Sequence, residues 1–350
     1  MARVRDPNLG WLKFFKIIFG EPLEKTTAFL SAWISYKPDD VVAAVDEVVD
    51  AVIDETLNFN RPIQFSDDLE HVYPIPFRKK ERSLVPAKYL NSQQSKTGSN
   101  YLAYIVEQPE ECDAKIVITV KSSADHFEHR EAIRQSWAPR EARKEDVQVV
   151  FLVGQGSDVI NDEIKEEFFK HKDLVIGNYV DSYQNLTIKA MTGIDWRARN
   201  CHNAEFVLAV DDDTFVNLDD MMTHLQRLPE EENFIECSER TVTKGKVWRE
   251  GQWAVSEDQY EFDVYPNYCN GPCYLMPVET ADLLLGASRT TPSDHPADDV
   301  FISGILRVKT EVPLIQYTRT GAPGWCQELN NRKPRLPQRM VKEHLKKSQL

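Results

Sequence analysis

Residues 206–217 read FVLAVDDDTFVN, and this stretch decides the fold. Its apolar first half, residues 206–210, passes directly into Asp211, Asp212 and Asp213. A short continuous apolar run is typical of a strand that is buried on both faces of a parallel sheet. Ligands of open α/β sheets bind at the carboxyl ends of such strands. We therefore expect the three carboxylates to lie at a binding edge of a sheet.

Strand and helix patterns alternate on the N-terminal side of this stretch. Apolar runs at residues 115–120 and 147–154 predict two further buried strands. Helical patterns occur at residues 129–137, 158–171 and 182–200. This alternation predicts an α/β fold in which helices flank a mostly parallel central sheet.

The chain of 350 residues has room for one large α/β domain with additions. We expect an N-terminal helical or extended region of unclear role at residues 1–110, the main domain at 111–330 and a basic tail at 331–350. Within the first region, the apolar stripe of residues 41–57 predicts a helix, and the polar residues 91–100 predict a linker.

Composition narrows the classes of function. The formal net charge of −14 argues against a nucleic-acid-binding protein, although a divalent cation can still bring a phosphorylated ligand to an acidic enzyme. No apolar run approaches the roughly 20 residues that span a bilayer, whereas the short run at residues 11–19 leaves a peripheral membrane contact open. Six cysteines without a C-x-x-C pair leave both disulfides and buried thiols open.

The three adjacent aspartates need a physical reason, because like charges repel one another. A hard divalent cation such as Mn²⁺ or Mg²⁺ takes oxygen ligands and can bind a diphosphate at the same time. The simpler interpretation is an exposed acidic turn. Apolar sequence on both sides favours a half-buried position, where the charges would be costly without a counter-ion.

Other aspartate motifs fit less well. A calcium loop that began at Asp211 would need Gly sixth and Glu twelfth, and Val216 and Met222 stand there. An aspartyl-phosphate phosphatase would use Asp211 and Asp213 in Asp-x-Asp-x-Thr, but Phe215 replaces the threonine, which weakens this alternative. The G-x-x-x-x-G-K-[ST] loop of P-loop nucleotide sites is not present.

A series of motifs resembles a known family. In chain order they are HREAIRQSW (129–137), VVFLVG (149–154), DSYQNLTIKAMTGIDW (181–196), FVLAVDDDTFVN, YPNYCNGPCYLMP (265–277) and ADDVFISGIL (297–306). Together they resemble the β-1,3-glycosyltransferases of glycosyltransferase family 31, which include galactosyl- and N-acetylglucosaminyltransferases and the Fringe enzymes. The resemblance covers about residues 113–310 and implies a GT-A fold, a DxD-type metal motif and inverting transfer from a UDP-sugar.

The resemblance also implies roles for the acidic residues. Asp213 would be the direct ligand of the metal, and Asp211 and Asp212 would contact the ribose or complete the metal shell. The family's E-D-V element matches Asp298-Asp299-Val300, which makes Asp299 the base that deprotonates the acceptor hydroxyl. Asp298 stands where Glu is usual. Without the resemblance, Asp298 and Asp299 would be taken for charges that stabilise a helix N-terminus.

Basic residues in two motifs are candidate donor ligands. Arg130 and Arg134 are four residues apart, so one helical face can present both to the diphosphate or the uridine. Asp181 and Lys189 are similar candidates for the nucleotide. The alternatives are solvent-exposed arginines paired with nearby glutamates, and a surface lysine.

Further expectations follow from the resemblance. Gly271 would let the backbone approach the donor or acceptor, unless it marks an ordinary turn, and His344 would be an additional metal ligand. We expect a UDP-sugar donor carrying galactose or an N-acetylhexosamine, a glycan acceptor on a glycoprotein or glycolipid, Mn²⁺ or Mg²⁺ as cofactor, and the Golgi lumen or membrane as location. A catalytically inactive, glycan-binding relative remains the alternative.

Overall fold

The computed structural model describes most of one compact unit, Pro62–Leu350, of the two units into which the chain divides. The described residues are 71–75, 77–91, 105–109, 112–138, 146–226, 228, 233–237, 241–242, 244–318 and 325–328. The helix predicted at residues 41–57, the apolar run at 11–19, the tail at 331–350 and nearly all of the linker at 91–100 lie outside them.

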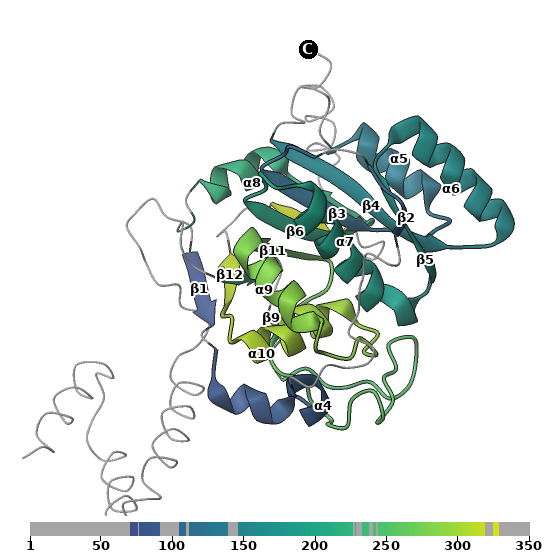
Figure 1. Cartoon of the computed structure of the whole chain (residues 1–350). Coiled ribbons are helices and arrows are strands. Elements are labelled where there is room, and N and C mark those ends of the chain that lie inside the picture. The colour runs from purple at the N-terminus through teal and green to yellow at the C-terminus, as the bar shows by residue number, and fades with distance from the viewer. Residues whose placement is uncertain are drawn as a thin grey trace, which may run out of the picture. The chain divides into compact units, whose positions relative to one another are not determined.

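A nine-stranded sheet forms the centre of this unit (Figure 1). Its strands, in the order in which they lie side by side, are β1 His71–Ile75, β12 Leu314–Thr318, β8 Ile235–Cys237, β11 Cys273–Pro277, β6 Phe206–Asp211, β3 Ile116–Lys121, β4 Val147–Gln155, β5 Leu174–Val180 and β2 Ile105–Glu107. Strands β3, β4, β5, β6, β8 and β12 run in one direction, and β1, β2 and β11 run in the other. The sheet is thus mixed but mostly parallel, which confirms the predicted α/β class.

Both edge strands, β1 and β2, come from residues before 110. Part of the predicted N-terminal region therefore completes the same sheet, and the boundaries at residues 110 and 330 stay predictions. Two small antiparallel pairs accompany the sheet: β9 Thr241–Val242 with β10 Tyr268–Cys269, and β7 Thr214–Val216 with β13 Cys326–Glu328.

The helices lie on both sides of the sheet. They are η1 Lys79–Leu84, α4 Ala87–Leu90, α5 Phe127–Gln135, α6 Asp158–His171, η4 Tyr183–Asn185, α7 Leu186–Asn200, α8 Leu218–Leu225, α9 Val278–Ser288, the π-helical segment η5 Val300–Leu306 and α10 Arg307–Thr310. Local signals set the ends of α6, because the Ser157 side chain caps its first turn and Lys172 ends it with a φ of 58°. None of the helices that the structure describes has the length and apolarity to cross a membrane.

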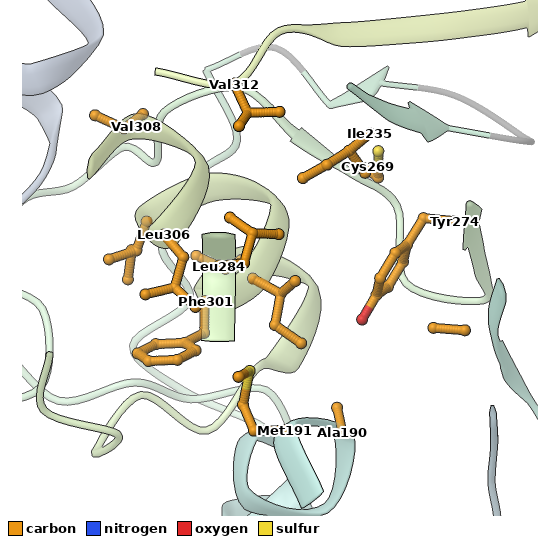
Figure 2. Packing of buried hydrophobic residues seen from close by; sticks show 14 of the residues in the cluster. Ala190, Met191, Ile235, Cys269, Tyr274, Leu284, Phe301, Leu306, Val308 and Val312 are labelled. Atoms are coloured by element: carbon orange, nitrogen blue, oxygen red, sulfur yellow. The ribbon is translucent and has the colours of Figure 1, made fainter. Parts of the chain in front are cut away.

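The side chains of β6 show why this strand is apolar throughout. Val207 and Ala209 pack into one core cluster, and Leu208 and Val210 pack into another on the opposite face, as the two-residue period of a strand requires. The first cluster is covered by α7, α9 and η5, and Figure 2 shows part of it around Phe301. The second lies against α5, α6 and α8.

All six cysteines form disulfides, which settles the choice that composition left open. The pairs are Cys112–Cys201, Cys237–Cys269 and Cys273–Cys326. The second and third bonds flank the three residues 270–272, so the chain on both sides of Gly271 is cross-linked to other strands.

Candidate active site

The three aspartates lie at the carboxyl end of β6, as predicted. Asp211 is the last residue of β6 and stands beside Lys121, the last residue of the parallel strand β3. Asp212 and Asp213 form the turn to β7, which begins at Thr214. All three aspartates are partly exposed, which excludes a fully solvated acidic turn.

Lys121 is the cation among the carboxylates. Its Nζ lies 2.9 Å from Asp211 Oδ1 and 2.7 Å from Asp298 Oδ2, and it donates to the Gly271 carbonyl at 3.3 Å. Burial lowers the pKa of Lys121, but the two carboxylates outweigh burial and raise this pKa well above its ordinary value. Lys121 therefore stays charged and joins three segments that are far apart in sequence.

Burial raises the pKa of the Asp211 carboxyl to about 6, although Lys121 opposes the shift. The pKa of Asp213 is also raised, by burial and then by the neighbouring Asp212 carboxylate. Both shifts mean that negative charge in this turn is incompletely balanced by the protein. A dication with oxygen ligands would complete the balance, so the donor set fits the predicted Mn²⁺ or Mg²⁺.

Asp299 stands at the start of η5, where its Oδ1 accepts a hydrogen bond of 2.7 Å from the Val300 amide. Burial, followed by the charge of the adjacent Asp298, raises the pKa of Asp299 to about 7. A Cβ added to Gly271 would lie 3.2 Å from Asp299 Oδ2. The glycine therefore lets the backbone pass directly beside this carboxylate. Lys121 joins the Gly271 carbonyl and the neighbouring Asp298 carboxylate to Asp211.

Asp212 has a different set of partners. Its Oδ2 accepts a hydrogen bond from Ser122 Oγ at 2.7 Å and lies 2.8 Å from His126 Nδ1. Ser122 directly follows β3 and in turn accepts a hydrogen bond from Arg130. Asp212 is thus oriented by the loop between β3 and α5, whereas Asp211 is oriented by Lys121.

Asp181 and Lys189, both predicted to contact the nucleotide, form an ion pair with each other. Lys189 Nζ lies 2.7 Å from Asp181 Oδ1 and donates to the Ser122 carbonyl at 2.6 Å, and the Gly154 amide donates to Asp181 Oδ2. Burial lowers the pKa of Lys189. The pair holds the Gly154 amide of β4 and the Ser122 carbonyl that follows β3. The alternative of a surface lysine is wrong because Lys189 is buried.

The two arginines are not presented to the site as expected. Arg130 is fully buried and its guanidinium binds Glu167 through both Nε and Nη2, the latter at 2.7 Å. Arg134 binds Glu167 at 2.8 Å and Asp173 at 2.7 Å. Direct contact of Arg130 with a diphosphate would require these buried bonds to break. Its contact with the donor stays a prediction, and the contacts observed are with neighbouring protein groups. Its Nη1 holds the Ser122 hydroxyl and the Ser123 carbonyl.

Several residues of the site were not predicted from the sequence, and one predicted residue cannot be placed. His344 lies outside the described residues. Lys121, Ser122 and His126 were not singled out. A signal for Lys121 existed, because it directly follows the strand predicted at residues 115–120. The carboxyl ends of parallel strands share one edge of the sheet.

Comparison with known proteins identifies relatives of this chain. Beta-1,3-galactosyltransferase 1 of Homo sapiens is 29% identical over 211 residues, which cover 58% of this chain and 64% of that protein. Lactosylceramide 1,3-N-acetyl-beta-D-glucosaminyltransferase B of Danio rerio is 28% identical over 219 residues, covering 57% of this chain and 56% of that protein. The chain therefore spans less than two thirds of the length of these curated relatives.

A solved structure described as the WbbM bifunctional glycosyltransferase in its apo form covers 57% of this chain and 38% of its own, at 12% identity and a TM-score of 0.33. A score this low supports no conclusion about function. The family model named Galactosyltransferase matches residues 128–318, which is more than half of the chain. The motif series, the mostly parallel α/β sheet and this match agree, and the chain belongs to the galactosyltransferase family of β-1,3-glycosyltransferases.

Proposed function

We propose that this chain is an inverting, metal-dependent hexosyltransferase. It moves galactose or an N-acetylhexosamine from a UDP-sugar to a hydroxyl of a glycan acceptor and forms a β-1,3 linkage. The family match supports the reaction class. The single observation that carries the mechanism is the Asp299 carboxyl, which has a pKa raised to about 7 and directly follows Asp298, whose carboxylate Lys121 joins to Asp211 at the end of β6.

Asp299 is the base of this proposal. Inverting displacement needs a carboxylate that accepts the proton of the acceptor hydroxyl while its oxygen attacks the anomeric carbon. The new carbon–oxygen bond forms as the bond to the diphosphate breaks, and UDP leaves with that electron pair. A carboxylate with a pKa near 7 is more basic than an ordinary one and is still largely ionised just above neutral pH, which suits proton transfer.

The aspartate turn is the metal and donor site of this proposal. Asp213 binds Mn²⁺ or Mg²⁺ directly, and Asp211 and Asp212 contact the ribose or complete the metal shell, as the family resemblance implies. The bound ion supplies charge neutralisation for the departing diphosphate. The raised pKa values of Asp211 and Asp213 support this assignment, because carboxylates that lack a full counter-charge favour cation binding.

Lys121 is a positioning residue. Its ammonium lies between Asp211 and Asp298 and also holds the Gly271 carbonyl, so it keeps the donor side and the base side of the site in register. Asp298, whose charge helps to raise the pKa of Asp299, is held by the same ammonium. Lys189 and Arg130 contribute indirectly, because both donate hydrogen bonds to Ser122 and so fix the loop that carries it.

The three disulfides favour a protein that matures in an oxidising compartment. This supports the proposal that it acts in the Golgi lumen or at the Golgi membrane. The acceptor would then be a glycan on a glycoprotein or glycolipid.

A screen of UDP-sugars with Mn²⁺ tests the proposal, with UDP release and acceptor glycosylation as readouts. Asp213→Ala and Asp299→Asn are each expected to abolish transfer, but only Asp213→Ala should weaken Mn²⁺-dependent UDP binding. Asp162→Asn, an exposed carboxylate on α6, is the matched control and should keep full activity. Full transfer by Asp299→Asn would remove the base assignment. A protein that binds glycans but releases no UDP from any donor would instead be an inactive relative.

A further inference from the structure

A histidine pair beside the aspartate turn has no role in the proposed reaction. His126, His129 and Asp212 each offer one metal-ligating atom, and these three atoms all lie within 4.8 Å of one another. Two imidazole nitrogens and one carboxylate oxygen form the kind of ligand set that proteins use for zinc and related dications.

The positions of the two histidines follow from the start of α5. His126 is the residue before the helix and His129 is one turn further on, so the two imidazoles share one face. Their rings stack, with centroids 4.3 Å apart. His126 Nδ1 already reaches Asp212 Oδ2 at 2.8 Å, so two of the three ligands are in place.

Groups that are not themselves metal ligands orient the Asp212 carboxylate. Ser122 Oγ donates to its Oδ2, and the buried Arg130 donates to Ser122 Oγ. Second-shell contacts of this kind orient the carboxylate that binds a metal. Ser122 and Arg130 are both buried, so they fix the orientation of the Asp212 carboxylate before a cation binds.

The cluster is open on the side of the histidines. His129 is exposed and the His126 side chain is 41% exposed, so an ion can enter from solvent. Metal–nitrogen bonds of about 2 Å place neighbouring tetrahedral ligand atoms roughly 3.3 Å apart. The three ligand atoms lie within 4.8 Å of one another, so their separations need to change by at most about 1.5 Å to reach that value.

The two imidazoles distinguish this cluster from the oxygen-only site proposed for Mn²⁺ or Mg²⁺, with which it shares Asp212. Imidazole favours zinc, cobalt and nickel, whereas carboxylate and water ligands favour magnesium and manganese. We propose that His126, His129 and Asp212 bind a divalent transition metal of the zinc and cobalt type, with one coordination position open to water, and that this binding does not require a UDP-sugar.

Cobalt titration of the full, tag-free chain tests this proposal. Co²⁺ added without nucleotide should produce the intense visible absorption of a four- or five-coordinate, nitrogen-ligated ion, and Zn²⁺ should displace it. His129→Ala and His126→Ala should each weaken Co²⁺ binding by at least about tenfold, since even second-shell changes have effects of this size. His202→Ala, which removes an exposed histidine after α7, is the control and should bind as the wild type does.

His129 is exposed, so its substitution leaves the core unchanged, and His129→Gln provides a second variant of similar size. Absorption that survives the His129 substitutions, or that falls equally in His202→Ala, would overturn the proposal. The titration contains no UDP-sugar, so its failure would leave the proposed transferase reaction unaffected.

Discussion

Replacing Lys121 with methionine removes the only buried cation that contacts both Asp211 and Asp298 within the described residues. The methionine keeps most of the apolar stem, so the main effect is the loss of the charge. Removal of one partner of a buried ion pair typically costs 3–5 kcal/mol, because the other charge is left without compensation. The Asp298 side chain is 6% exposed and carries most of this cost, whereas Asp211 is 38% exposed and is partly relieved by water.

We therefore expect Lys121→Met to lower the free energy of unfolding by about 3 kcal/mol at pH 8. For a domain of this size the corresponding fall in melting temperature is roughly 6–12 °C. The cost should be smaller at acid pH. Without the ammonium, the already raised pKa of the Asp211 carboxyl should rise further above its unfolded value. The variant then loses stability as pH rises between the unfolded and the folded pKa of this group, and regains it as pH falls.

Urea unfolding at pH 5.5 and pH 8 measures both effects. Lys165→Met is the matched control, because Lys165 pairs with Asp162 at 3.2 Å on the surface, with side chains 61% and 77% exposed. Its effect should stay within about 0.5 kcal/mol at either pH. Equal losses in the two variants, or a Lys121→Met penalty that grows toward acid pH, would refute the assignment of Lys121 as the charge that holds the site together.

Three further predictions follow from other contacts of the site and core. Asp298→Asn removes a negative charge that raises the pKa of Asp299, so the acid limb of kcat/KM, which lies near pH 7 in the wild type, should move to lower pH; an unchanged limb would contradict this cause. Gly271→Ala places a methyl group 3.2 Å from Asp299 Oδ2 and should lower kcat at least about tenfold in a transfer assay, while Mn²⁺-dependent UDP binding persists. Burial lowers the pKa of His295 to about 4, below the unfolded value, so its contribution is complete above about pH 6.5 and is lost as pH falls toward 4. Denaturant unfolding should show this loss of about 3 kcal/mol in the wild type, and His295→Gln should remove it.

The local pattern of the sequence was sufficient to predict three neighbouring strands at the centre of the nine-stranded sheet, but not the other six. The runs at residues 115–120, 147–154 and 206–210 became β3, β4 and β6, and the helix predicted at 158–171 is α6. These predictions succeed because apolar runs and helical periodicity are properties of neighbouring residues. The placement of Asp211 at a strand end also followed, since strand direction and ligand position are coupled in α/β sheets.

The partners of charged side chains could not be predicted in the same way. Arg130 was expected to contact a phosphate, but its counter-ion Glu167 arrives from a different helix, 37 residues later. The contact between His126 and Asp212 joins residues 86 positions apart. Such pairs depend on how the helices pack against the sheet. No local sequence pattern shows which carboxylate will contact a given arginine or histidine.

The two disulfides that flank residues 270–272 have a practical consequence for anyone who prepares this protein. They pin the short segment that carries Gly271 beside Asp299, so a reductant in the buffer or synthesis in a reducing cytosol should free that segment from β8 and β13. A sample could then look well folded by circular dichroism and still turn over no sugar. Thiol titration should therefore accompany every activity measurement, because the absence of transfer by a reduced sample does not test the proposed reaction.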